Sequence, residues 1–271
     1  EGGLTLEVWD AAGRLVRTLR DTAETPEYGP DDPDEPTRPP KPALSNEAGL
    51  HRAVWNLRYE GAARLDRLKV DLGDPREGPI APPGRYTLRR RAGGGGRGAT
   101  LDPQPDPRLT VTAEAYAAQL ELSLSVREAL DRTTRAIRTV RAVREQAQGL
   151  VDRLAEKPDA PAGVAELVAT AKRIVERGDA LARKLHNPDA QVVYDILAFQ
   201  GGTKLHSNLA FVFETVKWGE GAPTQGALEV FAELEKELAL YEAELAELLA
   251  TDVAAIDRLS TELALPRVLV P

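Results

Sequence analysis

The chain of 271 residues contains no cysteine and no methionine. Without cysteine it forms no disulfide bond, offers no thiol nucleophile and cannot build a zinc site from thiolates. The missing methionine predicts a processed or truncated piece of a longer chain, because a complete translation product begins with methionine and this sequence begins Glu1-Gly2-Gly3. Long apolar runs are also absent. None approaches the roughly 20 residues of a membrane-spanning helix, so we expect no membrane span.

Basic residues are fewer than acidic ones, and histidine is rare. The formal net charge is -8 and the pI is about 5.2, which argues against a nucleic-acid partner because phosphate binding needs a basic surface. The three histidines (His51, His186 and His206) lie in three separate segments, and none has a second ligand at metal-binding spacing. We therefore expect no metal site and no cofactor.

What the chain does contain is typical of a soluble globular protein, with 42% hydrophobic and 29% charged residues. The hydrophobic pattern changes near residue 112, from short strands and loops to long helices. The sequence therefore predicts an α+β protein of two domains, residues 1–111 and 112–271.

The first domain carries strand patterns separated by turn residues. Leu4, Leu6 and Val8 alternate with polar neighbours, a turn at Gly13 follows, and Leu15–Leu19 is the expected return strand. Further strands are expected at Gly49–Tyr59, weakly at Leu68–Leu72, and at Arg85–Arg90. The acidic, proline-rich residues 22–45 predict an exposed extended loop. Together these patterns favour a small antiparallel β-sandwich of the immunoglobulin-like kind.

The second domain is organised around one long helix, Thr112–Leu154, with Thr112 as its N-cap. Apolar residues recur along it at helical spacing, which predicts that Ile137 is fully buried and that Arg138 points to solvent or to the helix edge. Apolar seams also predict helices after Pro161, around Leu205–Val216, after Pro223-Thr224, and after Thr251 as a cap. Short connections between them favour an antiparallel up-and-down helical bundle.

No residue pattern predicts catalysis, and we assign no catalytic residue. Alternation places Trp9 on the polar side of its strand, where it suits either packing at the strand end or contact with a glycan or a neighbouring domain. His206 and Asn208 form a polar cluster near Lys204 that could bind a ligand. The paired carboxylates of the later helices, such as Glu242 and Glu244, are interpreted as solvated faces, although glycosidases do use two carboxylates.

Several segments resemble known bacterial proteins. Residues 6–19 (Leu-Glu-Val-Trp-Asp-Ala-Ala-Gly-Arg-Leu-Val-Arg-Thr-Leu) resemble the opening hairpin of flagellar hook-capping-type Ig-like domains. Residues 49–59, 81–87 and 106–108 resemble the C-terminal region of BNR-repeat proteins, the sortilin-like or glycosyl-hydrolase-like β-propellers. The resemblance continues at 221–225 and 249–253, so that it extends over nearly the whole chain.

This resemblance implies a function and a location that the residue patterns do not. It implies a non-catalytic C-terminal region of an exported, secreted or periplasmic protein, in which a preceding β-propeller is the first partner and the region supports it or mediates docking and assembly. The alternative is a carbohydrate-binding or catalysis-assisting part of a glycoside hydrolase. The resemblance carries no catalytic residue onto this chain.

Overall fold

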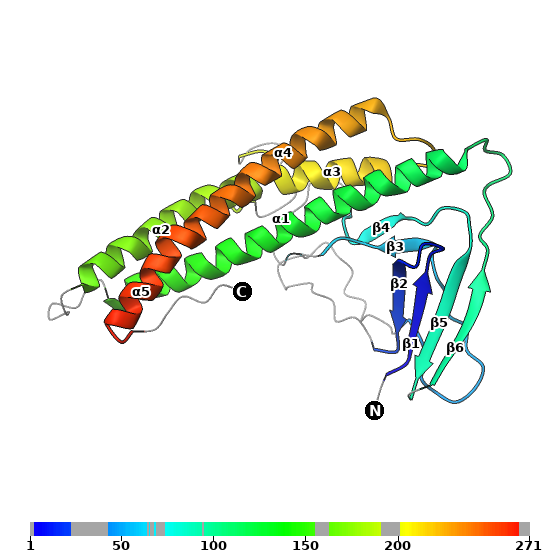
Figure 1. Ribbon diagram of the computed structural model, residues 1–271, viewed down its shortest axis with the longest axis horizontal. Coiled ribbons are helices and arrows are strands. Elements are labelled where there is room, and N and C mark those ends of the chain that lie inside the picture. Colours follow the sequence, from blue (N-terminus) through cyan, green and yellow to red (C-terminus); the bar gives the residue numbers. More distant parts are fainter. Residues whose placement is uncertain are drawn as a thin grey trace. The chain divides into compact units, whose positions relative to one another are not determined.

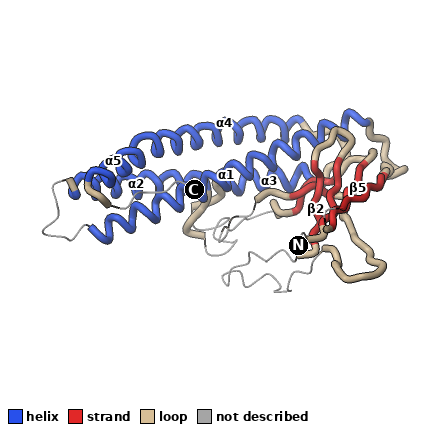
Figure 2. Tube along the Cα trace, turned by 60° about the horizontal axis from the view of Figure 1, so that its bottom comes forward, coloured by secondary structure: helices blue, strands red, loops and turns tan. Residues whose placement is uncertain are grey.

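The computed structural model describes residues 3–22, 43–63, 65, 68, 74–93, 95–154, 163–190 and 201–265. It contains antiparallel sheets and long helices, which confirms the α+β class (Figures 1 and 2). Most of the expected loop 22–45 and of the expected weak strand Leu68–Leu72 lies outside the described residues.

The chain divides into two compact units. The first comprises Glu1–Arg67, Asp74–Glu128 and Val212–Leu228, and it contains every strand found among the described residues. The second comprises Leu68–Gly73, Ala129–Phe211 and Glu229–Pro271. The predicted boundary lies at residue 112, just before the long helix, whereas these units divide the helix itself between Glu128 and Ala129.

The main sheet of the first unit has the strand order β2-β1-β5-β6, with all neighbours antiparallel. Its strands are β1 (Thr5–Trp9), β2 (Leu15–Arg20), β5 (Tyr86–Ala92) and β6 (Gly95–Leu101). The predicted hairpin between β1 and β2 is present. The Asp10 carboxylate closes its turn by accepting the backbone N–H groups of Ala12 and Arg14, and Gly13 supplies the positive φ of 78°.

A second sheet pairs β3 (Arg58–Glu60) with β4 (Glu77–Ile80). The strand expected from Gly49 to Tyr59 is therefore wrong over most of its length. Leu57 adopts a φ of 57°, and the indole N–H of Trp55 donates to the backbone carbonyl of Arg58 at 2.9 Å, which folds the segment back before pairing begins. A Cβ on Gly78 would collide with the Tyr59 backbone, so this pairing requires glycine.

The described apolar core of the first unit brings both sheets together with the start of the long helix. It consists of buried Val8, Val16, Tyr59, Ala81, Tyr86 and Leu120, with Trp55, Leu88 and Leu124 packed against it. The rings of Trp55 and Tyr86 meet edge to face, with centroids 5.2 Å apart. One face of β1 therefore packs against this core through Val8, as the alternating pattern of a half-buried strand predicts.

The helices are α1 (Ala113–Leu154), α2 (Val164–Leu185), α3 (Leu205–Lys217), α4 (Gln225–Leu248) and α5 (Ala254–Glu262). The cap at Thr112 is confirmed, since its hydroxyl accepts the backbone N–H of Ala115 at 3.2 Å. The prediction that Thr251 caps the last helix is wrong. This residue lies inside a π-helical turn, η2 (Leu249–Val253), that joins α4 to α5, and its hydroxyl donates to the carbonyl of Glu247.

In the second unit α1, α2, α4, η2 and α5 contribute to one apolar core. Its buried members are Val143, Ala147, Leu150, Leu167, Ala171, Ile174, Leu248, Val253, Ile256 and Leu259. The predicted phase of α1 is confirmed, because Ile137 has no exposed surface while Arg138 is exposed. Among the described residues, no helix is both long and apolar enough to cross a membrane.

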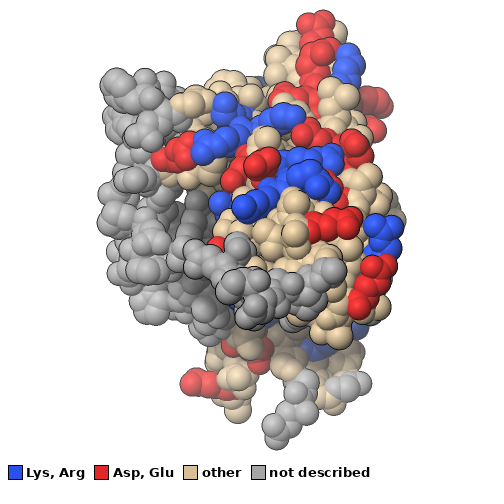
Figure 3. All heavy atoms as spheres, turned by 90° about the vertical axis from the view of Figure 1, so that its left-hand side faces the viewer, with Lys and Arg blue, Asp and Glu red and all other residues tan. Residues whose placement is uncertain are grey.

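Charged side chains of the helical unit pair across helices. Arg132 of α1 contacts the carboxylates of Glu235 and Glu242 on α4, while Arg173 and Arg177 of α2 contact Asp252 of η2. Figure 3 shows basic and acidic side chains interspersed on the face in view, without a large area of one sign. Such a surface suits a solvated protein face.

Candidate functional site

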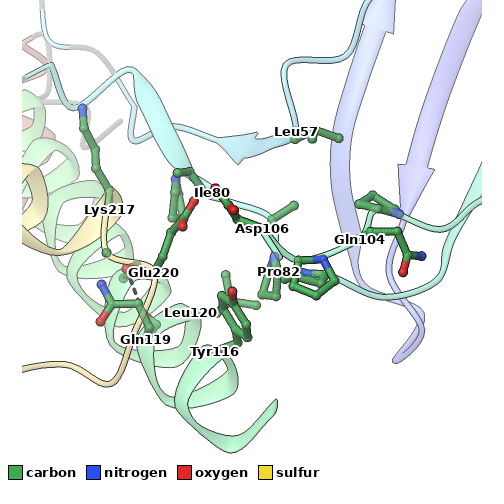
Figure 4. A pocket seen from close by; sticks show the side chains of 17 residues that line it. Leu57, Ile80, Pro82, Gln104, Asp106, Tyr116, Gln119, Leu120, Lys217 and Glu220 are labelled. Atoms are coloured by element: carbon green, nitrogen blue, oxygen red, sulfur yellow. Dashed lines mark hydrogen bonds between the residues drawn. The ribbon is translucent and has the colours of Figure 1, made fainter. Parts of the chain in front are cut away.

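A cavity of about 120 Å³ lies within the first unit. Its walls come from two proline-rich segments, Pro79–Pro83 at the end of β4 and Pro103–Asp106, and from the first turns of α1. Residues 217–220, where α3 ends, close it. Figure 4 shows Tyr116 and Leu120 of α1 beside Pro82, and the ammonium end of Lys217 directed away from them.

Most polar groups on the cavity wall already have partners within the protein. The side-chain amide of Gln119 donates to the carbonyl of Val216, and the Ser123 hydroxyl donates to the carbonyl of Gln119 at 2.8 Å. The carboxylate of Asp106 accepts both the backbone N–H and the guanidinium of Arg108. These hydrogen bonds hold the pKa of Asp106 below its ordinary value, so this carboxyl is an acceptor and not a proton donor near neutral pH.

Behind the cavity, Lys217 is fully buried and held by three oxygens. Its ammonium donates to the backbone carbonyl of Asp74 at 2.7 Å and pairs with Glu214 at 2.7 Å, and Glu77 lies 3.7 Å away. Burial alone would raise the pKa of Glu214, but hydrogen bonds from Lys217 and Trp218 outweigh it and lower the pKa. The lysine is thus a charge-neutralised anchor that joins the end of α3 to the segment before β4.

Arg58 and Trp218 extend this cluster toward the surface. The guanidinium of Arg58 lies 3.8 Å from the centre of the Trp218 ring, donates to the carbonyl of Gly78 at 2.9 Å, and pairs with Glu77. The indole N–H of Trp218 donates to Glu214 at 2.9 Å. Trp218 directly follows the last residue of α3, and 49% of its surface remains exposed.

Trp9, a predicted binding residue, lies on β1 on the polar face of the main sheet. Its indole N–H donates to the Glu7 carboxylate at 3.1 Å, and the guanidinium of Arg89 lies 4.8 Å from its ring centre. One face of the ring and its only polar atom are therefore occupied by neighbours. Its role in binding a glycan remains a prediction.

His206 and Asn208, the other predicted binding residues, lie on α3 in the second unit. His206 is only 3% exposed, and its Nδ1 atom has no hydrogen-bond partner in the described part of the protein. Burial, with a further contribution from His186, lowers the pKa of His206 to about 3. Asn208 is half-buried. The neutral, enclosed imidazole is a packing residue here, and ligand binding at this pair remains a prediction.

The described residues that line this cavity include no histidine, and its one serine, Ser123, donates its hydroxyl to a backbone carbonyl. Within the part of the chain that the structure describes, no group of three or more metal-ligating side chains is close enough to hold an ion. This cavity is smaller than the roughly 300–1,000 Å³ of typical small-molecule sites. The pKa of its Asp106 carboxyl is lowered by the hydrogen bonds from Arg108, whereas the acid of a glycosidase needs a raised pKa. The arrangement can fix the ends of α1 and α3 against the sheets.

Comparison of the chain with protein-family models, with curated proteins and with solved structures found no match in any of the three.

Sequence reasoning missed Lys217, Arg58 and Glu77 as a connected group. The partners are far apart in the chain: the Lys217 ammonium and the Asp74 carbonyl are separated by 143 positions. The available signal was a lysine on the apolar side of a short helix, next to Leu209, Phe213 and Val216 at helical spacing. A charged residue in an apolar row indicates a buried pair, although it does not identify the partner.

Proposed function

We propose that this chain is a non-catalytic accessory region that docks with another protein or domain. Two observations together support this best. Most polar groups that line the cavity already form hydrogen bonds within the protein, and several large apolar side chains are exposed on the surface. On the segment before β3, Leu50 is fully exposed and Val54 is 64% exposed, and Trp218 is half exposed. Exposed apolar side chains mark an interaction surface where they form one contiguous patch, and we propose that Leu50 and Val54 belong to such a patch.

The resemblance to the C-terminal regions of BNR-repeat proteins supplies the context for this proposal. In that context the partner is a preceding β-propeller of the same parent chain, and the parent is exported to the cell envelope or the medium. We further propose that the first unit is an Ig-like sandwich, supported by two antiparallel sheets that share one core, and that the second unit is an up-and-down helical bundle, supported by its long amphipathic helices.

Two measurements test the accessory role. The coding sequence upstream of Glu1 is expected to encode propeller repeats, and the separately produced propeller is expected to bind this chain in a calorimetric titration. A screen of the chain against glycosides, esters and peptides is expected to give no turnover. Robust turnover, or a propeller that does not bind, would contradict the proposal.

The carbohydrate-binding alternative makes a different prediction. Glycan-array binding that is lost in Trp9→Ala would support it. The occupied state of Trp9, with Glu7 on its N–H and Arg89 over its ring, favours the docking role instead.

A further inference from the structure

The strand β6 forms one edge of the main sheet, and nothing in the described structure pairs with its outer side. The strand order β2-β1-β5-β6 places it at the end, where Figure 1 shows it beside β5. All seven of its residues are exposed. Edge strands in natural proteins are usually protected by proline, bulges, covering segments or several charges. This strand has no proline, its pairing with β5 is regular, and its only charged residue is Arg97.

The hairpin that ends in this edge is strongly basic, although the chain as a whole has a net charge of -8. Between Tyr86 and Leu101 it carries Arg89, Arg90, Arg91 and Arg97 and no acidic residue. Arg91 pairs with Glu7 and Arg89 lies over Trp9. Arg90 and Arg97 are directly opposite one another in the β5–β6 register, and within the described residues neither forms an ion pair.

The two faces of β6 carry different side chains, and these determine what kind of strand could pair with its outer edge. Leu101 and Ala99 are in register with the core residues Tyr86 and Leu88, so they share the face that packs inward, followed by Arg97 on the same face. Gly96 and Gly98 occupy the opposite face and carry no side chain. Thr100 also lies on that face. A strand added beside β6 would therefore meet apolar side chains near Leu101 and a positive charge near Arg97 on one face, and on the other only the side chain of Thr100.

We propose that β6 is a docking edge that accepts an extended acidic segment of a partner protein as a fifth strand of the sheet. Main-chain hydrogen bonds along the edge would hold the segment, and carboxylates facing Arg90 and Arg97 would select it. A second copy of this chain fits less well as the occupant, because edge-to-edge pairing would bring two hairpins together, each with four arginines and no carboxylate. This inference deepens the docking role proposed above and rests on it.

The experiment uses the full chain and a random twelve-residue peptide library displayed on phage. Selected peptides should alternate apolar and polar positions and be enriched in Asp and Glu. A synthetic copy of the best peptide is then measured by fluorescence anisotropy. Arg90→Gln and Arg97→Gln should each weaken binding about two- to fivefold, the range of exposed ion pairs, and added salt should weaken it further. Arg20→Gln, an exposed arginine on the opposite edge strand β2, is the matched control and should bind as the parent chain does.

Backbone methylation of the peptide separates strand addition from simple charge attraction. N-methyl groups on alternate residues that face β6 should abolish binding, whereas the same groups on the other alternate set should leave it intact. Selection without acidic enrichment, binding that survives both arginine substitutions, or equal tolerance of the two methylation patterns would overturn the edge site. If the propeller still binds in calorimetry while the peptides fail, the docking role stands and only its location on β6 is wrong.

Discussion

The buried histidines of the helical unit predict a loss of stability as the pH falls from 7 to 5. His186 is 4% exposed and His206 is 3% exposed. Burial, together with the nearby guanidinium of Arg141, lowers the pKa of His186 to about 4, and burial with the contribution of His186 lowers the pKa of His206 to about 3. Both imidazoles are therefore neutral in the folded protein at pH 5, while the same groups in the unfolded chain, with a pKa of about 6.5, bind a proton.

The size of the effect follows from this difference in bound protons. Because the unfolded state binds more protons between the folded and unfolded pKa values, the free energy of unfolding is highest above pH 6.5 and decreases as the pH falls toward the folded values. Between pH 7 and pH 5 each histidine removes about 2 kcal/mol, or about 4 kcal/mol for the pair. This result depends little on the folded pKa values provided that they lie well below 5. It is a large part of the 5–15 kcal/mol, roughly, that stabilises a typical domain.

The assay is urea unfolding followed by far-ultraviolet circular dichroism at pH 7 and at pH 5. His186→Asn and His206→Asn are expected to lower stability at pH 7 through lost packing. The free energy of unfolding at pH 7 exceeds that at pH 5, and each substitution should reduce this difference by about 2 kcal/mol, because asparagine binds no proton in this pH range. His51→Asn, at an exposed position of the first unit, is the matched control and should retain the full difference. Variants at His186 and His206 that keep the pH dependence of the parent chain would refute the reasoning.

Three other predictions concern packing, the buried ion cluster and the boundary. Ile137→Ala should lower the free energy of unfolding by about 2–5 kcal/mol and Arg138→Ala by less than about 0.5 kcal/mol, and equal effects in urea would mean that the phase of α1 is wrong. Lys217→Met keeps the aliphatic volume but leaves Glu214 and the Asp74 carbonyl without their cation, so it should cost about 1–3 kcal/mol by the same assay. The exposed pair Lys236–Glu233 is its control, and a loss from Lys236→Met as large as that from Lys217→Met would contradict the anchoring role. A fragment of residues 112–271 should still melt cooperatively by circular dichroism, but below the full chain because Leu120 and Lys217 lose their partners among the strands; absence of a cooperative transition would reject residue 112 as a boundary.

The helices could be predicted from the sequence because each presents an apolar row at helical spacing. Ile137 lies in such a row on α1, and its burial follows from the pattern alone. The structure of the segment before β3 could not be predicted as well, because its sequence pattern is that of a strand and the structure has none there. His51 to Tyr59 alternate as a strand would, but a positive φ at Leu57 and the hydrogen bond from Trp55 to Arg58 fold the backbone away from pairing. Alternating apolar and polar residues indicate that the side chains would fit a half-buried sheet. They do not indicate whether the backbone has a neighbouring strand to pair with.

Two of the features that local patterns missed have the same physical origin. Lys217 is buried on the apolar side of α3 because Asp74 and Glu214 supply its oxygens, and Asp252 is buried in η2 because Arg173 and Arg177 of α2 reach it. In the second case the partner Arg177 lies 75 positions away in the chain. A buried charge is tolerable only when such a partner is brought to it by the tertiary fold, so neither its presence nor its cost can be read from neighbouring residues. Asp252 lies within the π-helical turn Leu249–Val253, where one of its carboxylate oxygens contacts Arg173 and the other contacts Arg177.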